Sequence, residues 1–113
     1  MRFIGLKTCD TCKTALKALA AAGRDVTVTD VRADGVAEDD LRDWIAAKGA
    51  DALINRRSTT WRGLDEAARA EAETTQGAVA LLLAHPTLMK RPVIVTSNGI
   101  FVGWDKAAQA ALL

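Results

Sequence analysis

The spacing of apolar and polar residues changes along the chain, and each change predicts a different element. The run Arg2–Leu6 (RFIGL) is typical of a buried strand, and Asp25–Val31 (DVTVTDV) alternates valine with polar residues, as half-buried strands do. Between them, Lys13–Ala22 is rich in Ala, Leu and Lys and predicts a helix with one apolar face, which Gly23 would end. Its candidate N-caps are Thr8, Asp10 and Thr11. Strand, helix and strand in this order predict a βαβ unit with a right-handed crossover.

The middle of the chain has helical spacing. Leu41, Trp44 and Ile45 recur at i, i+3 and i+4, which predicts a helix that buries Trp44 in the core. Further helices are expected over Leu64–Glu73 and Thr75–Ala84. The polar and basic stretch Asp51–Gly63 breaks the pattern, so we expect an irregular connection there.

The spacing returns to that of strands near the end. Pro92–Thr96 and Ile100–Val102 flank Ser97-Asn98-Gly99, and Asn-Gly between β-branched runs predicts a hairpin. Lys106–Leu113 closes the chain as a helix. The order β-α-β, helices, β-β-α predicts an α/β protein with a thioredoxin-like mixed sheet and a helical insertion at about residues 36–88.

Composition limits the classes of protein to consider. A length of 113 residues predicts a single domain, residues 1–113, and a net charge of +1 gives no field that favours nucleic acid. The longest apolar run, Ala78–Ala84, is too short to span a bilayer, and Lys7 interrupts the apolar start before a secretory signal could form. We therefore expect a cytoplasmic protein that binds neither nucleic acid nor membrane.

The two cysteines, Cys9 and Cys12, are the chain's clearest chemical signal. A zinc site needs about four ligands, and the only histidine, His85, has no partner motif, so we expect no metal. A reducing compartment disfavours a structural disulfide. Paired cysteines after a strand then point to redox chemistry.

Cys9 falls between a predicted strand end and helix start, where free N–H groups and the helix dipole stabilise a thiolate. Cys12 lies one helical turn further on. It can resolve an adduct on Cys9, or it can be a small apolar residue of the first turn, and the spacing allows both.

Four blocks of the sequence together resemble the ArsC/Spx family, and most closely its YffB-like, arsenate-reductase-related branch. These blocks are Ile4–Lys13, Asp30–Gly35, Leu53–Arg62 and His85–Ile94. They occur in order and the final strand and helix also match, so the resemblance extends over essentially the whole chain.

The resemblance implies a thioredoxin-like fold in which Cys9 is the nucleophile. It implies that Arg91 contacts an anion or oxidised sulfur above the cysteine, and that Pro92 is cis and faces the thiol. Arg57 matches the arginine of the family's Asn-x-Arg stretch, which implies a second, anion-binding cation near Cys9, whereas we expect Arg56 and Arg62 to be solvated loop charges. Guanidinium groups suit this task because they bind oxyanions and carboxylates in a fork and lower the pKa of a nearby thiol.

Two departures from the family pattern affect the expected function. Trp104 stands where glutaredoxin-linked arsenate reductases carry a third arginine, which weakens the case for arsenate as the substrate. Packing and substrate contact are both open for this side chain. The Cys9/Cys12 pair also resembles the Cys-x-x-Cys of Spx regulators, which bind RNA polymerase and sense oxidants.

We therefore expect a thiol-dependent oxidoreductase that acts on an oxyanion or a glutathione mixed disulfide. No bound cofactor is expected; glutathione would be the reductant or co-substrate, glutaredoxin is a further partner to consider, and the protein would be a monomer. The alternative is an Spx-like redox-sensing regulator that binds RNA polymerase.

Overall fold

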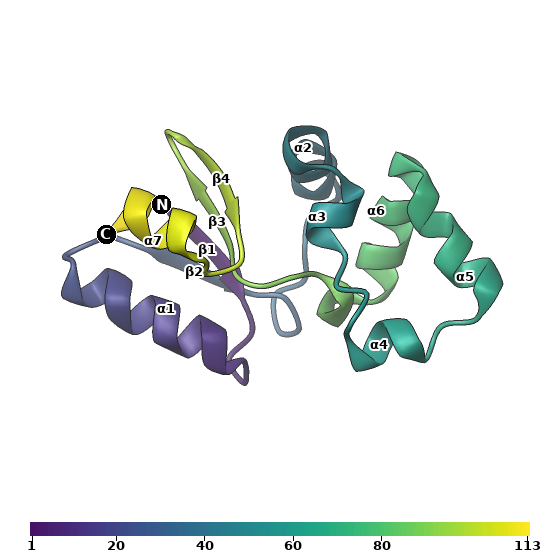
Figure 1. The fold of residues 1–113 in the computed structure, drawn as a ribbon, viewed down its shortest axis with the longest axis horizontal. Helices are drawn as coiled ribbons and strands as arrows, with labels where there is room; N and C mark the ends of the chain where they lie inside the picture. Colours follow the sequence, from purple (N-terminus) through teal and green to yellow (C-terminus); the bar gives the residue numbers. More distant parts are fainter. The chain divides into compact units, whose positions relative to one another are not determined.

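The computed structural model describes residues 1–113, which form two compact units (Figure 1). The first, here called the sheet unit, consists of Met1–Asp34 and Arg91–Leu113. The second, the helical unit, is the continuous segment Gly35–Lys90. The chain runs β-α-β in the sheet unit, passes through the helical unit and returns as β-β-α. The α/β arrangement predicted from the sequence is confirmed.

Four short strands form one mixed sheet in the order β2-β1-β3-β4. They are β1 (Arg2–Gly5), β2 (Thr27–Asp30), β3 (Val93–Thr96) and β4 (Gly99–Val102). β1 and β2 are parallel and the other pairs are antiparallel. The parallel pair needs a crossover connection, which α1 (Asp10–Ala21) provides. In register, Gly5 pairs with Asp30, so the ends of β1 and β2 meet at the same end of the sheet.

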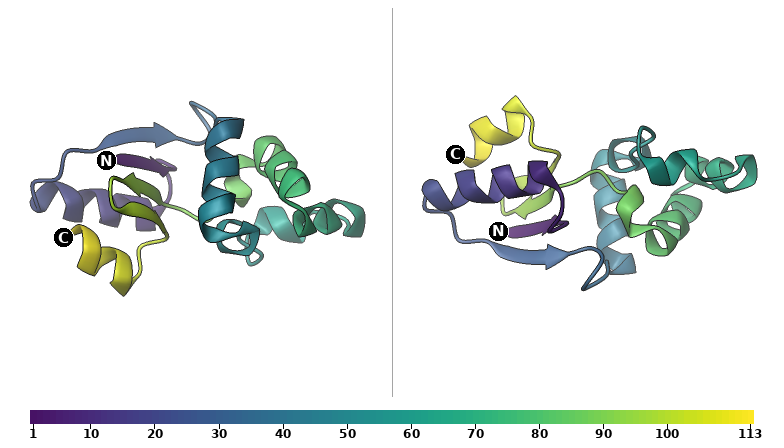
Figure 2. Two further views of the ribbon diagram at one scale, coloured as in Figure 1. Left: turned by 90° about the horizontal axis from the view of Figure 1, so that it is seen from above. Right: turned by 90° about the horizontal axis from the view of Figure 1, so that it is seen from below.

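One face of the sheet is covered by both α1 and α7 (Lys106–Leu112) (Figure 2). Phe3 and Ile94 are paired across β1 and β3, and both are fully buried. They share one apolar cluster with side chains of the two helices, namely Cys12, Ala15, Leu19, Ala108 and Leu112. Cys12 is therefore part of the core of the sheet unit.

The helix α1 begins earlier than predicted. Its N-cap is Cys9, not one of the three candidates Thr8, Asp10 and Thr11, and Cys9 makes no side-chain cap hydrogen bond. Asp10 is already the first helical residue, where its charge suits the helix dipole. The end at Gly23 is confirmed: Gly23 has φ +74°, a conformation that glycine adopts without strain.

Two details of the strands differ from the prediction. Alternation over Asp25–Val31 predicted a half-buried strand, yet Val28 in it is 51% exposed, because β2 is an edge strand. In the hairpin, Thr96 pairs directly with Gly99, so the turn residues are Ser97 and Asn98. Gly99 is the first residue of β4 with φ +138°, which only glycine adopts readily. The Asn-Gly signal located the hairpin but not its register.

The helical unit contains five α-helices and two 3₁₀ helices: α2 (Glu38–Lys48), α3 (Ala50–Leu53), α4 (Thr59–Arg62), α5 (Glu66–Ala70), η1 (Glu71–Glu73), α6 (Thr75–Ala84) and η2 (Pro86–Leu88). Trp44 is 2% exposed, as predicted. The expectation of irregular structure over Asp51–Gly63 is partly wrong. Most of α3 and all of α4 fall there, and α4 starts because Ser58 Oγ accepts the N–H of Trp61 at 3.1 Å.

None of the helices combines the length and the apolar character needed to cross a lipid bilayer.

Candidate functional site

The loop between β1 and α1 carries Cys9 to the start of the helix. The Cys9 amide donates to the carbonyl of Leu6 at 3.0 Å, which closes a tight turn. Its own carbonyl accepts the amide of Lys13 at 3.1 Å, the first hydrogen bond of the helix. Cys9 is the N-cap residue of α1, and it is partly exposed, so it lies at the helix N-terminus and is accessible from solvent. This is the location that the sequence predicts for it.

Cys12 lies in the first turn of α1 and is 2% exposed. Both cysteines are free thiols. The Cys12 sulfur packs against Gly5 of β1, where a β-carbon would lie 2.8 Å from it. Cys12 therefore has the packing of a small apolar residue as well as contact with Cys9.

Hydrogen-bond donors surround the sulfur of Cys9. Partial burial raises the pKa of Cys9, but other contacts outweigh that effect. The backbone N–H and the thiol of Cys12 donate to the Cys9 sulfur, and the guanidinium of Arg91 adds a hydrogen bond and a positive charge. Because each of these contacts stabilises the thiolate, the pKa of Cys9 lies below its ordinary value.

The pKa of Cys12 is shifted in the opposite direction, above its ordinary value. Burial and, to a smaller extent, the adjacent Cys9 sulfur raise the pKa of Cys12 to about 11, although the N–H of Leu6 and the charge of Arg91 act against this. The two thiols are thus different in kind. Near neutral pH, Cys12 keeps its proton and donates it in a hydrogen bond to Cys9, which is the more readily ionised thiol.

Arg91 and Pro92 directly precede β3, and Arg91 lies beside this pair of thiols. The Arg91–Pro92 peptide bond is cis, which confirms that expectation. The carbonyl of Pro92 accepts the amide of Gly103 at 2.8 Å. Cys9, Cys12 and Arg91 come together within the sheet unit from segments far apart in the sequence.

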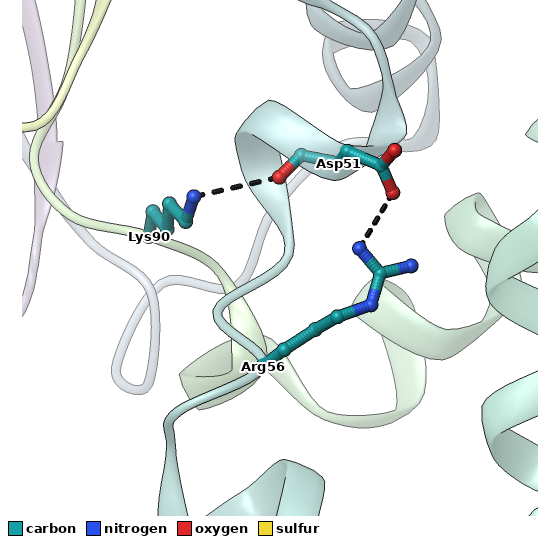
Figure 3. A network of polar contacts seen from close by, with 3 residues as sticks. All are labelled: Asp51, Arg56 and Lys90. Atoms are coloured by element: carbon teal, nitrogen blue, oxygen red, sulfur yellow. Dashed lines mark hydrogen bonds and ion pairs between the residues drawn. The ribbon is translucent and has the colours of Figure 1, made fainter.

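Arg57 belongs to the helical unit, where it lines a polar pocket of about 410 Å³. The other lining residues are Asp51, Ile54, Asn55, Arg56 and Lys90. Figure 3 shows Arg56 and Lys90 approaching Asp51 from different segments. The Arg56 guanidinium pairs with the Asp51 carboxylate at 2.5 Å, and Lys90 Nζ donates to the Asp51 carbonyl at 3.4 Å. Since Arg56 neutralises the one carboxylate, Arg57 and Lys90 give the pocket a positive charge suited to an anion.

Arg56 and Arg62, the arginines expected to be solvated, are exposed, and each also makes specific contacts. Arg56 lies over the ring of Trp61, 5.1 Å from its centroid, and Arg69 lies at 5.8 Å from the same centroid. The Arg62 guanidinium donates to the carbonyl of Arg57 at 2.7 Å. Of these residues, Arg62 is the one that holds the main chain of Arg57, a contact that the sequence pattern did not predict.

Trp104 is partly buried and packs against the apolar cluster of the sheet unit. Its carbonyl accepts the side-chain amide of Gln109 at 3.3 Å. Packing, one of the two roles left open for Trp104, is thus observed. No three His, Cys, Asp or Glu side chains are grouped so as to hold a metal ion.

Asp30 is the one buried charged residue, and its sequence context predicted no role for it. Its carboxylate accepts backbone N–H groups of Lys7, Arg32 and Ala33. One sequence feature could have drawn attention to Asp30: it is a carboxylate at the end of the strand-forming run Asp25–Val31.

Comparison with known proteins decides the family. Residues 4–112 match the model of the ArsC family. The chain belongs to the ArsC family. An uncharacterised protein of Haemophilus influenzae is 41% identical over 108 residues, which covers 95% of this chain and 94% of that protein.

Solved ArsC-like structures have the same fold. A protein called YFFB matches with a TM-score of 0.92 and 37% identity, over 99% of this chain and 97% of that one. An arsenate reductase (ArsC) related protein from Brucella melitensis matches with a TM-score of 0.75 and 33% identity, over 97% of this chain and 91% of that one. The expected family and thioredoxin-like fold are confirmed, and ArsC membership supports a thiol-dependent oxidoreductase.

Proposed function

We propose that this ArsC-family protein is a glutathione-linked thiol reductase that uses Cys9 as its nucleophile. The observation that carries the proposal is the set of donors around one accessible sulfur, namely the amide and thiol of Cys12 and the guanidinium of Arg91. A thiolate is the reactive form in thiol exchange, so a lowered pKa raises reactivity near neutral pH.

The reaction begins with attack of the Cys9 thiolate on the sulfur of a glutathione mixed disulfide. The S–S bond of the substrate breaks, a new S–S bond forms between Cys9 and glutathione, and the other thiolate leaves and takes a proton from water. A second glutathione thiolate then attacks this adduct, releasing oxidised glutathione and restoring the Cys9 thiolate. One free glutathione thiol is consumed per turnover: its sulfur leaves joined to the glutathione of the substrate as oxidised glutathione, while the other half of the substrate leaves as a reduced thiol.

Arg91 has two roles in this proposal. Before the reaction it stabilises the Cys9 thiolate by charge and hydrogen bond. During the reaction it holds negative charge on the attacked or leaving group. Arg57 is assigned a second anion contact through the family resemblance, and the positively charged pocket that it lines suits a carboxylate.

A glutathione adduct is favoured over arsenate as the substrate. Packing accounts for Trp104, which stands where glutaredoxin-linked arsenate reductases carry a third arginine. One missing hydrogen bond to a charged oxyanion weakens binding by about 1.5–3 kcal/mol. Glutathione is a tripeptide with two carboxylates, so it offers more groups for recognition than arsenate and would depend less on that arginine.

Cys12 has two roles available. As a protonated donor, it stabilises the Cys9 thiolate throughout the cycle. As a resolving thiol, it would attack the Cys9 adduct, give a Cys9–Cys12 disulfide and release reduced glutathione. Its burial and raised pKa favour the donor role, because little thiolate is present near neutral pH.

The test compares reduction of a glutathione mixed disulfide by the wild type, Cys9→Ser and Cys12→Ser, with arsenate reduction measured in parallel. We expect the Cys9→Ser protein to be inactive and the Cys12→Ser protein to retain turnover at a reduced rate. Full activity of Cys9→Ser would refute the mechanism. A reversible Cys9–Cys12 disulfide with no turnover of either substrate would favour the redox-sensing regulator, which a pull-down of RNA polymerase with oxidised and reduced protein would then examine.

A further inference from the structure

Asp30 is an unusual residue in this protein because it is charged and only 5% exposed. A buried carboxylate is unfavourable unless hydrogen bonds replace its hydration. Here they do: Oδ1 accepts the amides of Arg32 at 2.9 Å and Ala33 at 2.8 Å, and Oδ2 accepts the amide of Lys7 at 2.9 Å. The amides of Ala33 and Lys7 hold the pKa of Asp30 below its usual value, against the effect of burial, so Asp30 is a carboxylate at neutral pH.

The two oxygens of Asp30 bind different parts of the sheet unit. Oδ1 holds the turn that directly follows β2, which is a local contact. Oδ2 reaches the loop between β1 and α1, across 23 positions of sequence. Pairing of Gly5 with Asp30 brings the two strand ends together and makes this second contact geometrically available.

The contact with Lys7 acts on the same peptide group that holds Cys9. The peptide bond between Leu6 and Lys7 is planar, so its carbonyl and its N–H are fixed relative to each other. The N–H donates to Asp30, and the carbonyl accepts the amide of Cys9 at 3.0 Å. Asp30 therefore fixes the orientation of the peptide group to which the Cys9 main chain is bonded.

Leu6 also contacts the second thiol, because its own N–H donates to the Cys12 sulfur. The turn Leu6–Cys9 thus connects Asp30 with both cysteines through main-chain groups. We propose that Asp30 is a positioning residue for Cys9, acting through the Leu6–Lys7 peptide to hold the Cys9 sulfur among its hydrogen-bond donors. This inference rests on the proposed function, in which Cys9 is the reacting thiolate.

A positioning role and a simple charge effect have opposite consequences. If Asp30 acted only as a nearby negative charge, removing that charge would favour the Cys9 thiolate. If Asp30 positions the turn, removing its acceptor would misalign the donors from Cys12 and Arg91 and disfavour the thiolate. A purely structural role would lower stability without changing the Cys9 thiol. The sign of the change in thiol reactivity separates these three cases.

The test variant is Asp30→Asn, which keeps the size of the side chain but leaves one oxygen for the three amides. With that oxygen on Arg32 and Ala33, the new NH₂ group faces the N–H of Lys7 and cannot accept it. Asp34→Asn is the matched control, because this substitution removes one negative charge from the same turn. The Asp34 carboxylate accepts only the amide of Asp30 itself, at 2.9 Å, and accepts no hydrogen bond from Lys7.

The measurement is the pH-dependent alkylation rate of each cysteine, resolved by peptide mass spectrometry, together with urea unfolding. We expect Asp30→Asn to lower the Cys9 alkylation rate at pH 7 by about threefold or more, and Asp34→Asn to leave it near wild type. An unchanged or faster rate in folded Asp30→Asn overturns the proposal. If wild-type Cys9 itself has an ordinary thiol pKa, the proposed function fails instead.

A second measurement covers the case in which Asp30→Asn does not fold. Hydrogen exchange of the wild-type protein reports directly on the amides of Lys7 and Cys9. We expect both to be protected, because each donates a hydrogen bond within the turn. Exchange of the Lys7 amide at the rate of an unprotected peptide would contradict the contact on which the inference depends.

Discussion

Gly5 and Cys12 are in contact so close that any side chain at position 5 would force a neighbouring residue to shift. A β-carbon there would lie 2.8 Å from the Cys12 sulfur and 2.9 Å from Cε1 of Phe3. Both neighbours belong to the buried core of the sheet unit and have little room to move. The absence of a side chain at Gly5 thus allows Cys12 to lie beneath β1 with its thiol near Cys9.

The first prediction concerns this contact. We expect Gly5→Ala to reduce the free energy of unfolding by about 1–3 kcal/mol, the usual effect of an extra methyl group in a filled core. Urea unfolding measures it. In a Cys12→Ala background the sulfur is gone, so the same substitution should be less destabilising. An equal loss in both backgrounds would mean that the Gly5–Cys12 contact is not the cause.

The second prediction concerns Arg91. Replacing it with alanine removes a hydrogen bond and a positive charge from the Cys9 sulfur, so the pKa of Cys9 should rise and its alkylation at pH 7 should slow several-fold. Lys17→Ala is the matched control, since it removes one positive charge from an exposed position on α1. Identical pH profiles for Arg91→Ala and wild type would rule out the assigned role of Arg91.

The third prediction is a two-part dependence of stability on pH. The pKa of Cys9 is lower in the folded than in the unfolded state, so stability due to Cys9 rises with pH between the folded value and the unfolded value. The pKa of Cys12 is raised to about 11, so the folded state keeps a proton that the unfolded state loses. Stability due to Cys12 therefore falls as pH rises from about 9 to 11, by roughly 2 kcal/mol.

Urea unfolding under reducing conditions measures this dependence. Lysines also titrate in this pH range, but their contribution to the free energy of unfolding cancels when wild type is compared with a single cysteine variant. Cys9→Ser should lose the rise with pH below the ordinary thiol pKa. Cys12→Ala should lose part of the fall above it. If the difference between wild type and Cys12→Ala is the same at pH 8 and pH 10.5, the two thiols do not differ as described.

The fourth prediction concerns the helical unit. The Arg62 guanidinium donates to the carbonyl of Arg57 at 2.7 Å. We expect Arg62→Ala to release this part of the main chain and raise KM for a glutathione mixed disulfide about threefold, with little change in kcat. Arg42→Ala is the control, since Arg42 pairs only with Glu38 of the same helix, at 3.5 Å. Equal KM values for the two variants would assign Arg62 no part in substrate binding.

Much of the fold could be predicted because it follows from local patterns. The helix expected over Thr75–Ala84 is α6 with the same bounds, and Thr74 caps it by accepting the amide of Gly77. The exposure of Val28 could not be predicted, since alternation does not reveal which strand lies at the sheet edge. The helix α4 was missed because a single turn depends on one cap, Ser58, more than on apolar periodicity.

The site was predictable to a different extent. The position of Cys9 could be predicted from the junction of strand and helix. The place of Arg91 in the site and the cis bond to Pro92 could be predicted only from the family resemblance. The parts played by Gly5 and Asp30 depend on which residues meet across β1 and β2. A local pattern contains no information on that register, so the contacts of these two residues became visible only in the structure.

The most direct test of the account is the pKa of Cys9 in the wild-type protein, read from residue-resolved alkylation rates across pH. The donors from Cys12 and Arg91 predict a Cys9 titration below that of an ordinary thiol, while Cys12 remains almost unreactive until well above it. If Cys9 titrates like a free cysteine, or if Cys12 is the more reactive thiol, the assignment of Cys9 as the activated nucleophile is wrong.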